Sequence, residues 1–123
     1  MTVFEGAIIN IMGGVHAIPP PESNEVTEVK YWKVFEVESA ADKMGKTRHL
    51  VAYCILDNEG RVSSNIVEVV PNEEGKLLLK TGSGRIYHLQ GPPGSHSEAS
   101  YVWGIWRHRN LVTFERDVTK EYI

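Results

Sequence analysis

The sequence contains little cysteine and no long apolar run, and each shortage excludes a class of protein. Cys54 is the single cysteine, so no internal disulfide can form, which favours a reducing compartment. No run of about 18 apolar residues is present to span a bilayer. A basic and then apolar signal segment is also absent from the first residues. We therefore expect a cytoplasmic protein without membrane contact.

The chain also lacks an excess of positive charge. Sixteen acidic residues against 13 Lys and Arg give a formal net charge of −3. Proteins that bind duplex nucleic acid are usually basic, so this balance argues against such a partner. A hydrophobic content of 41% over 123 residues is that of a folded protein with a buried core. We expect one β-rich domain over residues 1–123.

Motifs for catalysis or for cofactor binding are missing as well. The five histidines show no helical pairing at three or four residues, and no cysteine pair accompanies them, so no metal site is predicted. There is no Gly-x-Ser-x-Gly elbow. The stretch Gly82–Arg85 lacks the Lys-Ser/Thr of a phosphate loop and reads as a hairpin turn. Cys54 lies in an apolar run, a setting that raises the pKa of a thiol and lowers its nucleophilicity. We predict no cofactor and no catalytic residue, which leans against an enzyme.

What the sequence does contain is a series of apolar-rich runs separated by turn clusters. The runs are Arg48–Leu56, Arg61–Val70, Lys76–Thr81 and Arg85–Gln90, and the turns are Asp57–Gly60, Pro71–Gly75 and Gly82–Gly84. Alternating apolar runs bounded by glycine, proline, asparagine and aspartate are typical of antiparallel hairpins. They predict a β-meander.

The flanking segments extend this pattern. We expect strands at Thr2–Met12, ended by Gly13 and Gly14, at Glu25–Glu38 and at Leu111–Val118, an extended connection at Pro19–Pro21, and a loop or one helical turn at Ser39–Lys46. Glu25–Glu38 carries apolar residues at both parities and is predicted to be buried on two sides. The predicted fold is mainly β: six to seven strands in an antiparallel meander, as a twisted sheet or small open barrel. Its edge strands favour a homo-oligomer.

The segment Ser97–Arg109 is open to two interpretations. Ser97 could cap a helix that starts at Glu98 and ends at Asn110, with apolar residues at helical spacing. Alternatively, its aromatic and β-branched residues could form a strand. The helix is favoured. The predicted core consists of Trp32, Val34, Phe35, Val51, Tyr53, Ile55, Val67, Val69, Leu78, Ile86, Leu89 and Ile105.

The richest local chemistry lies within this segment. Trp103 and Trp106 are followed by Arg107 and Arg109, and arginine beside an aromatic face suits anionic, planar ligands. Arg85 could join the same patch, together with Lys80 and Arg116, if the last strand packs near the final hairpin. These five residues, Arg85, Trp103, Trp106, Arg107 and Arg109, are the predicted ligand-binding site. The alternative is that the indoles are core and the arginines cover the helix end.

Two segments resemble small β-rich proteins of phages and prophages. One runs from Gly60 through Val62, Ser63 and Ser64 into the strand with Val67 and Val69, and the other is the hairpin Thr81–Leu89; together they cover about a third of the chain. Some proteins of that group sequester nucleotide signals, as the Thoeris anti-defence sponges do. Others block an effector protein, as anti-CRISPR proteins do.

Three functions follow as hypotheses. The first is a non-enzymatic, phage-encoded binding protein that sequesters an anionic nucleotide-like signal and so inhibits bacterial immunity. The second is a protein-interaction module that inhibits or scaffolds a macromolecule, and buried indoles would favour it. The third is a small enzyme of unknown reaction, which would need a pocket with perturbed acids.

Overall fold

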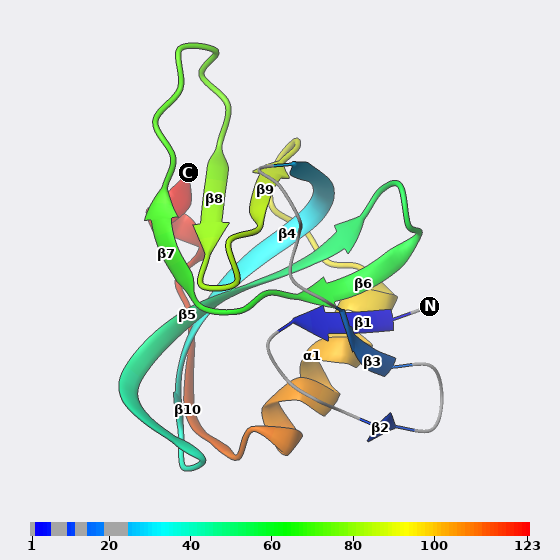
Figure 1. The fold of residues 1–123 in the computed structure, drawn as a ribbon, viewed down its shortest axis with the longest axis vertical. Coiled ribbons are helices and arrows are strands. Elements are labelled where there is room, and N and C mark those ends of the chain that lie inside the picture. The colour runs from blue at the N-terminus through cyan, green and yellow to red at the C-terminus, as the bar shows by residue number, and fades with distance from the viewer. Residues whose placement is uncertain (1, 6–9, 12–14, 19–24) are drawn as a thin grey trace.

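The computed structural model describes residues 2–5, 10–11, 15–18 and 25–123, and it confirms a mainly β fold with one helix near the C-terminus (Figure 1). The elements are β1 (Thr2–Glu5), β2 (Asn10–Ile11), β3 (Val15–Ile18), β4 (Val26–Ser39), β5 (Asp42–Cys54), β6 (Glu59–Val62), β7 (Ile66–Val69), β8 (Leu78–Thr81), β9 (Ile86–Leu89), α1 (Ser97–Arg109), β10 (Val112–Asp117) and the 3-10 helix η1 (Thr119–Tyr122). In the described ranges, no helix is long and apolar enough to cross a membrane.

The strands form one mixed, open sheet in the order β2-β3-β1-β6-β5-β4-β9-β8-β7, with β10 paired to β4. The predicted hairpins are present as two antiparallel units, β4–β5–β6 and β7–β8–β9. A parallel pairing of β4 with β9 joins the units, and β1 pairs in parallel with both β3 and β6. The meander is therefore interrupted, because the chain leaves one unit between β6 and β7.

The break falls inside the predicted run Arg61–Val70, at Ser63–Asn65. The Ser63 hydroxyl accepts a hydrogen bond from Leu50 N at 2.9 Å and donates one to Ser64 O at 2.7 Å, which satisfies backbone groups where the strand stops. The following strand, β7, lies at the sheet edge. As a consequence Val67 and Val69, which were predicted to be core, are 55% and 54% exposed, and that prediction was wrong.

A one-residue bulge in β4 decides which side chains are buried. Lys30 lies opposite Tyr53 while Lys33 lies opposite Val51, so two residues of β4 face one residue of β5. Tyr31, one of the two, adopts a left-handed backbone with φ +52°. The extra residue shifts the alternation by one, and Val29 and Trp32 therefore reach the same hydrophobic cluster although an unbroken strand would place them on opposite faces.

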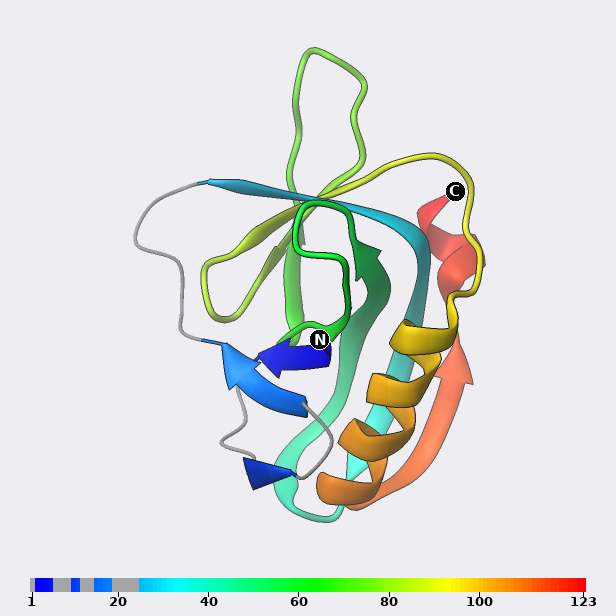
Figure 2. The ribbon, with the colours of Figure 1, turned by 90° about the vertical axis from the view of Figure 1, so that its right-hand side faces the viewer.

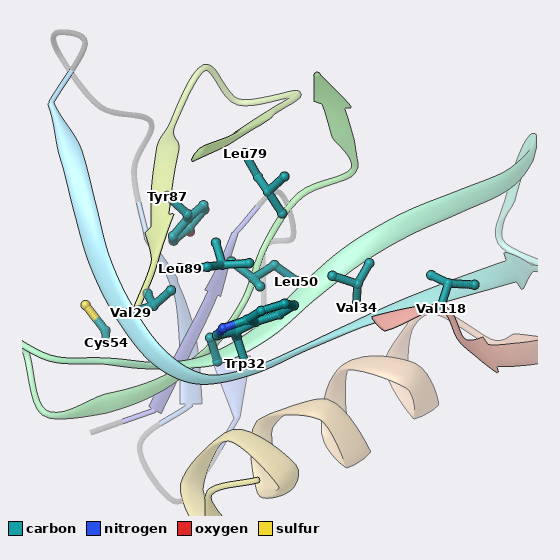
Figure 3. Close-up of a cluster of buried hydrophobic side chains, with 10 residues drawn as sticks. Val29, Trp32, Val34, Leu50, Cys54, Leu79, Tyr87, Leu89 and Val118 are labelled. Carbon is teal, nitrogen blue, oxygen red and sulfur yellow. The ribbon is translucent and has the colours of Figure 1, made fainter. Parts of the chain in front are cut away.

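The long strand is buried on both faces, as predicted. One cluster fills the concave side of the sheet (Figure 3) and comprises Val29, Trp32, Val34, Leu50, Ala52, Cys54, Leu79, Tyr87, Leu89 and Val118. The other lies between the sheet and α1 and comprises Val37, Val51, Val62, Ala99, Val102, Trp103 and Trp106, with Phe35, Ile105 and Val112 packed against it. The long strands β4 and β5 thus hold two separate cores.

Four further expectations need correction or limits. Ser39–Lys46 is a tight turn at residues 40 and 41 between β4 and β5, and most of it is strand. In place of Ser97, His96 is the N-cap of α1, and its Nδ1 accepts a hydrogen bond from Glu98 N at 3.2 Å. Within the predicted strand Thr2–Met12, the structure describes two separate strands, β1 and β2. Residues 6–9, Met12, Gly13, Gly14 and Pro19–Pro21 lie outside the described residues.

The helix lies alongside β10 (Figure 2) and packs on β6. Gly60 fixes how closely the helix approaches β6. A Cβ at Gly60 would lie 2.4 Å from the carbonyl carbon of Glu98 and 2.5 Å from Ala99 N. Both are backbone atoms, which cannot rotate away. The glycine therefore allows the start of α1 to pack directly on β6.

We predict that Gly60→Ala destabilises the fold by about 1–3 kcal/mol, because the helix must move or strain. Urea unfolding followed by circular dichroism measures this change. Gly104→Ala is the matched control: apart from its own turn of helix, no atom of the described residues lies within 4 Å of its Cβ position, and alanine favours helix by up to about 1 kcal/mol. Equal stability of Gly60→Ala and the unmodified protein would contradict the packing described.

Candidate functional site

The two predicted indoles lie inside the protein. Trp103 and Trp106 are 7% and 5% exposed. Trp103 stacks between Phe35 and Trp106, with ring centroids 4.8 and 5.3 Å away, and Trp106 also contacts the His49 ring at 4.5 Å. Their ring faces are occupied by protein neighbours, so the indoles serve mainly as core.

The predicted arginines separate into different environments. Arg107 forms an ion pair with Glu115 at 2.5 Å, and the same carboxylate accepts a hydrogen bond from Trp103 Nε1 at 3.4 Å. Arg109 is exposed in the last turn of α1. Arg85 precedes β9 and bonds Thr27 Oγ1 at 3.3 Å. Figure 2 shows the β8–β9 turn and α1 on opposite sides of the view.

The wider basic patch does not assemble either. It required the last strand to lie near the final hairpin, yet β10 pairs with residues 35–39 of β4 and β9 pairs with residues 26–29. Arg116 is held by Glu36 at 3.1 Å, and Lys80 lies on β8. The structure therefore groups Trp103, Trp106 and Arg107 but leaves Arg85 elsewhere.

A different aromatic group, at the start of α1, emerges from the fold. The His96 ring stacks on Tyr53 with centroids 4.0 Å apart and an interplanar angle of 27°, and on Tyr31 at 5.8 Å and 25°. Because His96 Nδ1 accepts the helix-capping hydrogen bond, the ring is oriented by α1 itself. We call Tyr31, Tyr53 and His96 the ring stack.

Two hollows adjoin the ring stack. A small one of about 60 Å³ lies between β4 and the start of α1 and is lined by Tyr31, Lys33, His96, Ser100 and Trp103, among others. A larger one of about 500 Å³ is lined by Lys30, Tyr31 and the segment Gln90–Gly94. Lys30 Nζ lies 5.2 Å from the centre of the Tyr31 ring. Tyr31 thus faces both hollows, with a lysine beside each.

The backbone at Tyr31 marks this place as unusual. A bulky aromatic residue at positive φ is uncommon and costs of order 1–2 kcal/mol. Such strain persists where surrounding structure enforces it and is frequent at binding sites. The bulge also turns the ring outward, leaving it 43% exposed. Sequence reasoning missed this group, because neither the bulge nor the meeting of β4, β5 and α1 is written in a local motif.

A second polar group lies on the concave side, around Arg61. Its Nη2 donates to Glu59 Oε1 at 2.6 Å and to Asp57 Oδ2 at 3.2 Å, and the Arg61 side chain is 4% exposed. Burial opposes its charge, but Tyr87, Cys54 and Glu59 outweigh this and hold the pKa of Arg61 above its usual value. Nε and Nη1 are buried and have no hydrogen-bond partner among the residues that the structure describes.

Cys54, Asp57 and Glu59 bring three possible metal-ligand atoms within 4.8 Å of one another. The Arg61 guanidinium already lies against both carboxylates, so it supplies the positive charge that a cation would bring. Burial raises the pKa of the Cys54 thiol above its ordinary value, although Arg61 acts in the opposite direction. The arrangement is that of a buried ion pair with an unreactive thiol.

Comparison with known proteins supplies no relative from which a site could be assigned, so the choice of site rests on geometry. No protein-family model, curated protein or solved structure matches this chain. The stack has an exposed aromatic face, two lysines and adjoining hollows, whereas Arg61 and Glu59 are buried and paired with each other. The ring stack is therefore the candidate functional site.

We predict that Arg61→Met destabilises the protein by about 3–5 kcal/mol, since it leaves the Glu59 carboxylate buried without its partner. The double variant Arg61→Met/Glu59→Leu should recover most of this loss, because replacing both members of a buried pair by apolar groups is often nearly neutral. Urea unfolding of the four proteins in this cycle measures it. Additive losses in the double variant would show that the pair is not coupled.

A prediction on pH follows from three carboxyl groups. Hydrogen bonding from Arg48 holds the pKa of Glu36 below its ordinary 4.5. Burial acts to raise the pKa of Glu28, but hydrogen bonds from Gln90 and His88 lower it below its ordinary value. In the same way, hydrogen bonds from Thr119 lower the pKa of Asp117 despite its burial. Lowered folded-state pKa values add stability that is complete above about pH 4.5 and is lost as pH falls through those lowered values.

Urea unfolding from pH 7 to pH 3 should therefore show a stability that falls below about pH 4.5, with a shallower fall in Glu36→Gln than in the unmodified protein. Glu73→Gln, in an exposed turn, is the control. An identical pH slope in Glu36→Gln and Glu73→Gln would contradict the role of the Arg48–Glu36 pair.

Proposed function

We propose that this protein is a non-enzymatic binding protein for an anionic ligand that carries a planar ring, of the nucleotide type. The observation that carries the proposal is the exposed Tyr31 ring, held at positive φ between two lysine-lined hollows. A base would stack on the tyrosine, and the ammonium groups of Lys30 and Lys33 would attract phosphate.

The geometry around Tyr31 supports stacking in particular. His96 and Tyr53 back the ring on one side, and Lys30 Nζ lies over the Tyr31 ring at 5.2 Å. The Lys30 ammonium lies over the face of Tyr31 on which a ligand base would stack. The base can replace the ammonium there while the ammonium turns to the phosphate, so few other side chains have to move on binding.

The start of α1 contributes to the same end of the site. Backbone N–H groups at a helix N-terminus favour negative charge, and the smaller hollow lies beside residues 95–100 with Lys33 across from them. In this proposal the phosphate approaches the smaller hollow and the base lies over Tyr31. The tryptophans then stabilise the helix that presents the site, in place of the stacking role proposed from the sequence.

The biological form of the proposal follows from the resemblance to small phage proteins. A binder without catalytic groups acts by withholding its ligand, and a cytoplasmic, phage-encoded protein of this kind would sequester a nucleotide signal of bacterial immunity. Cyclic nucleotides and ADP-ribose derivatives are the ligands of first choice, since each combines a base with phosphate.

Calorimetry with a panel of cyclic nucleotides and ADP-ribose derivatives tests the proposal. We predict that at least one binds, that Tyr31→Leu weakens binding by about 5- to 100-fold through loss of stacking, and that Tyr31→Phe retains it. Lys33→Gln should also weaken binding, and the loss of affinity should be larger at low salt than at high salt because salt screens the charge.

Lys80→Gln, which removes a lysine from β8 outside the site, should leave the affinity unchanged. Absence of binding across the whole panel would sink the nucleotide proposal. Equal losses in Tyr31→Leu and Lys80→Gln would place the ligand elsewhere.

A protein-interaction module is the second candidate, and the burial of Trp103 and Trp106 favours it over stacking on those indoles. Val67 and Val69 on the edge strand β7 supply exposed apolar surface for such contacts, with a partner macromolecule or with a second copy of the chain. Light scattering of the purified protein, with and without Val67→Lys, separates self-association from ligand binding.

A further inference from the structure

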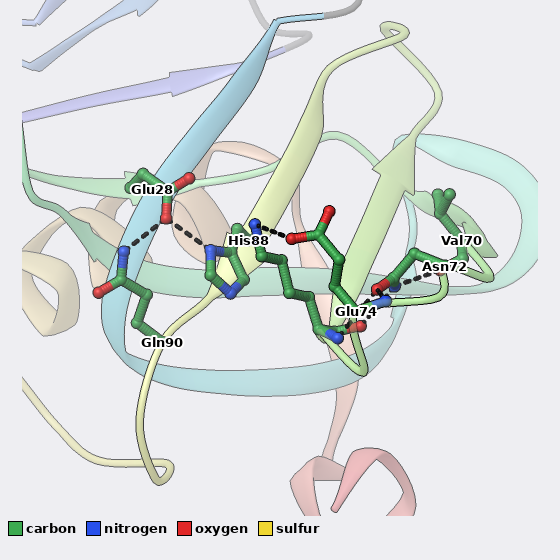
Figure 4. A network of polar contacts seen from close by, with 7 residues as sticks. Glu28, Val70, Asn72, Glu74, His88 and Gln90 are labelled. Carbon is green, nitrogen blue, oxygen red and sulfur yellow. Dashed lines mark hydrogen bonds and ion pairs between the residues drawn. The ribbon is translucent and has the colours of Figure 1, made fainter.

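Another polar group, independent of the ring stack and of the Arg61 group, lies where β4 pairs with β9. His88 Nδ1 lies 2.5 Å from Glu28 Oε1, and Gln90 Nε2 donates to the same oxygen at 2.5 Å (Figure 4). His88 and Glu28 are direct neighbours in the parallel register. The sheet itself therefore positions the pair.

The carboxylate fixes which imidazole nitrogen carries the proton. Partial burial acts to raise the pKa of Glu28, but hydrogen bonds from Gln90 and His88 outweigh it and keep that pKa below its ordinary value. The carboxylate is therefore ionised and can only accept. Neutral His88 must then hold its proton on Nδ1, which leaves a lone pair on Nε2. Within the described residues, no group bonds His88 Nε2.

His88 also lines a hollow of about 550 Å³. The hollow is mostly apolar, with Trp32, Leu77, Leu89, Pro92, Pro93 and Tyr122 among its lining residues. Its polar side chains include His88, Gln90, Lys76 and Tyr122; Lys76 is paired with Glu74 at 3.0 Å, and the Tyr122 hydroxyl accepts a hydrogen bond from Arg48 at 3.4 Å. Gln90 donates to Glu28 through Nε2, so His88 Nε2 and Gln90 Oε1 are the side-chain acceptors that His88 and Gln90 offer to a ligand in the hollow.

We infer that this hollow binds a neutral molecule with an apolar, planar body and a hydroxyl donor, of the phenol class. The hydroxyl donates to His88 Nε2, and the ring packs against the proline and leucine side chains. An anion is disfavoured, because the two acids Glu28 and Glu74 lie beside His88 and Lys76 in this region. This ligand class differs from the nucleotide of the proposed function, and so does the site.

Heteronuclear NMR titration of the full chain with phenol and with anisole tests the inference, because anisole has the same ring without the donor. At pH 8 we expect phenol to shift the resonances of Leu77, His88 and Gln90, and to bind about two- to tenfold more tightly than anisole. His88→Phe should remove this preference while keeping a ring in place. His108→Phe, on the exposed end of α1, should retain it.

Three results would overturn the inference: no binding of phenol, equal affinity for phenol and anisole, or a preference that survives in His88→Phe. If His88→Phe unfolds, Glu28→Leu serves as the second variant, and it should weaken the preference because no acceptor at this position then holds the proton on Nδ1. Nucleotide binding at the ring stack is measured separately and does not enter this outcome.

Discussion

The bulge at Tyr31 is the constraint on which the rest of this structure depends. One extra residue in β4 changes the face on which every later side chain of the strand lies. It lets Val29, Trp32 and Val34 join one core while Phe35 and Val37 pack beneath α1. It also turns the Tyr31 ring outward, beside His96. The same local distortion therefore builds two cores and the candidate site.

Several polar contacts hold the chain around this strand. Val34 N donates to Thr119 Oγ1 at 3.0 Å, and Val118 N donates to Val34 O at 2.9 Å, so the C-terminal segment closes over β4 beyond the bulge. On the other face, His49 is fixed by Ser63 O and Thr47 Oγ1 beneath Trp106. These buried groups are hydrogen-bonded, which makes the position of each layer specific.

Much of the fold could be predicted from the sequence, because alternation and turn residues act locally. The strand at Glu25–Glu38, the hairpin turn at Gly82–Gly84 and the helix at Ser97–Arg109 follow from such patterns. The break after Val62 did not, since Ser63 ends the strand through contacts with β5. Val67 and Val69 were predicted to be core because the pattern of Arg61–Val70 predicts one continuous strand.

The candidate site was less accessible to sequence reasoning. Trp103 and Arg107 were noticed because they are close in sequence, but the structure uses that indole in the core. Tyr31, Tyr53 and His96 are separated by 22 and 43 positions and come together only through the β4–β5 register and the seat of α1 on Gly60. Positive φ at a tyrosine carries no sequence signal.

The most direct test is the β4–β5 register in solution, read from cross-strand nuclear Overhauser effects. We predict that Lys30 faces Tyr53 and Lys33 faces Val51, with a Tyr31 amide coupling and intraresidue contact that report positive φ. An unbroken register continuing from Val29 opposite Cys54 would instead place Lys33 opposite Leu50. That result, with an extended Tyr31, would contradict both the two-core arrangement and the site.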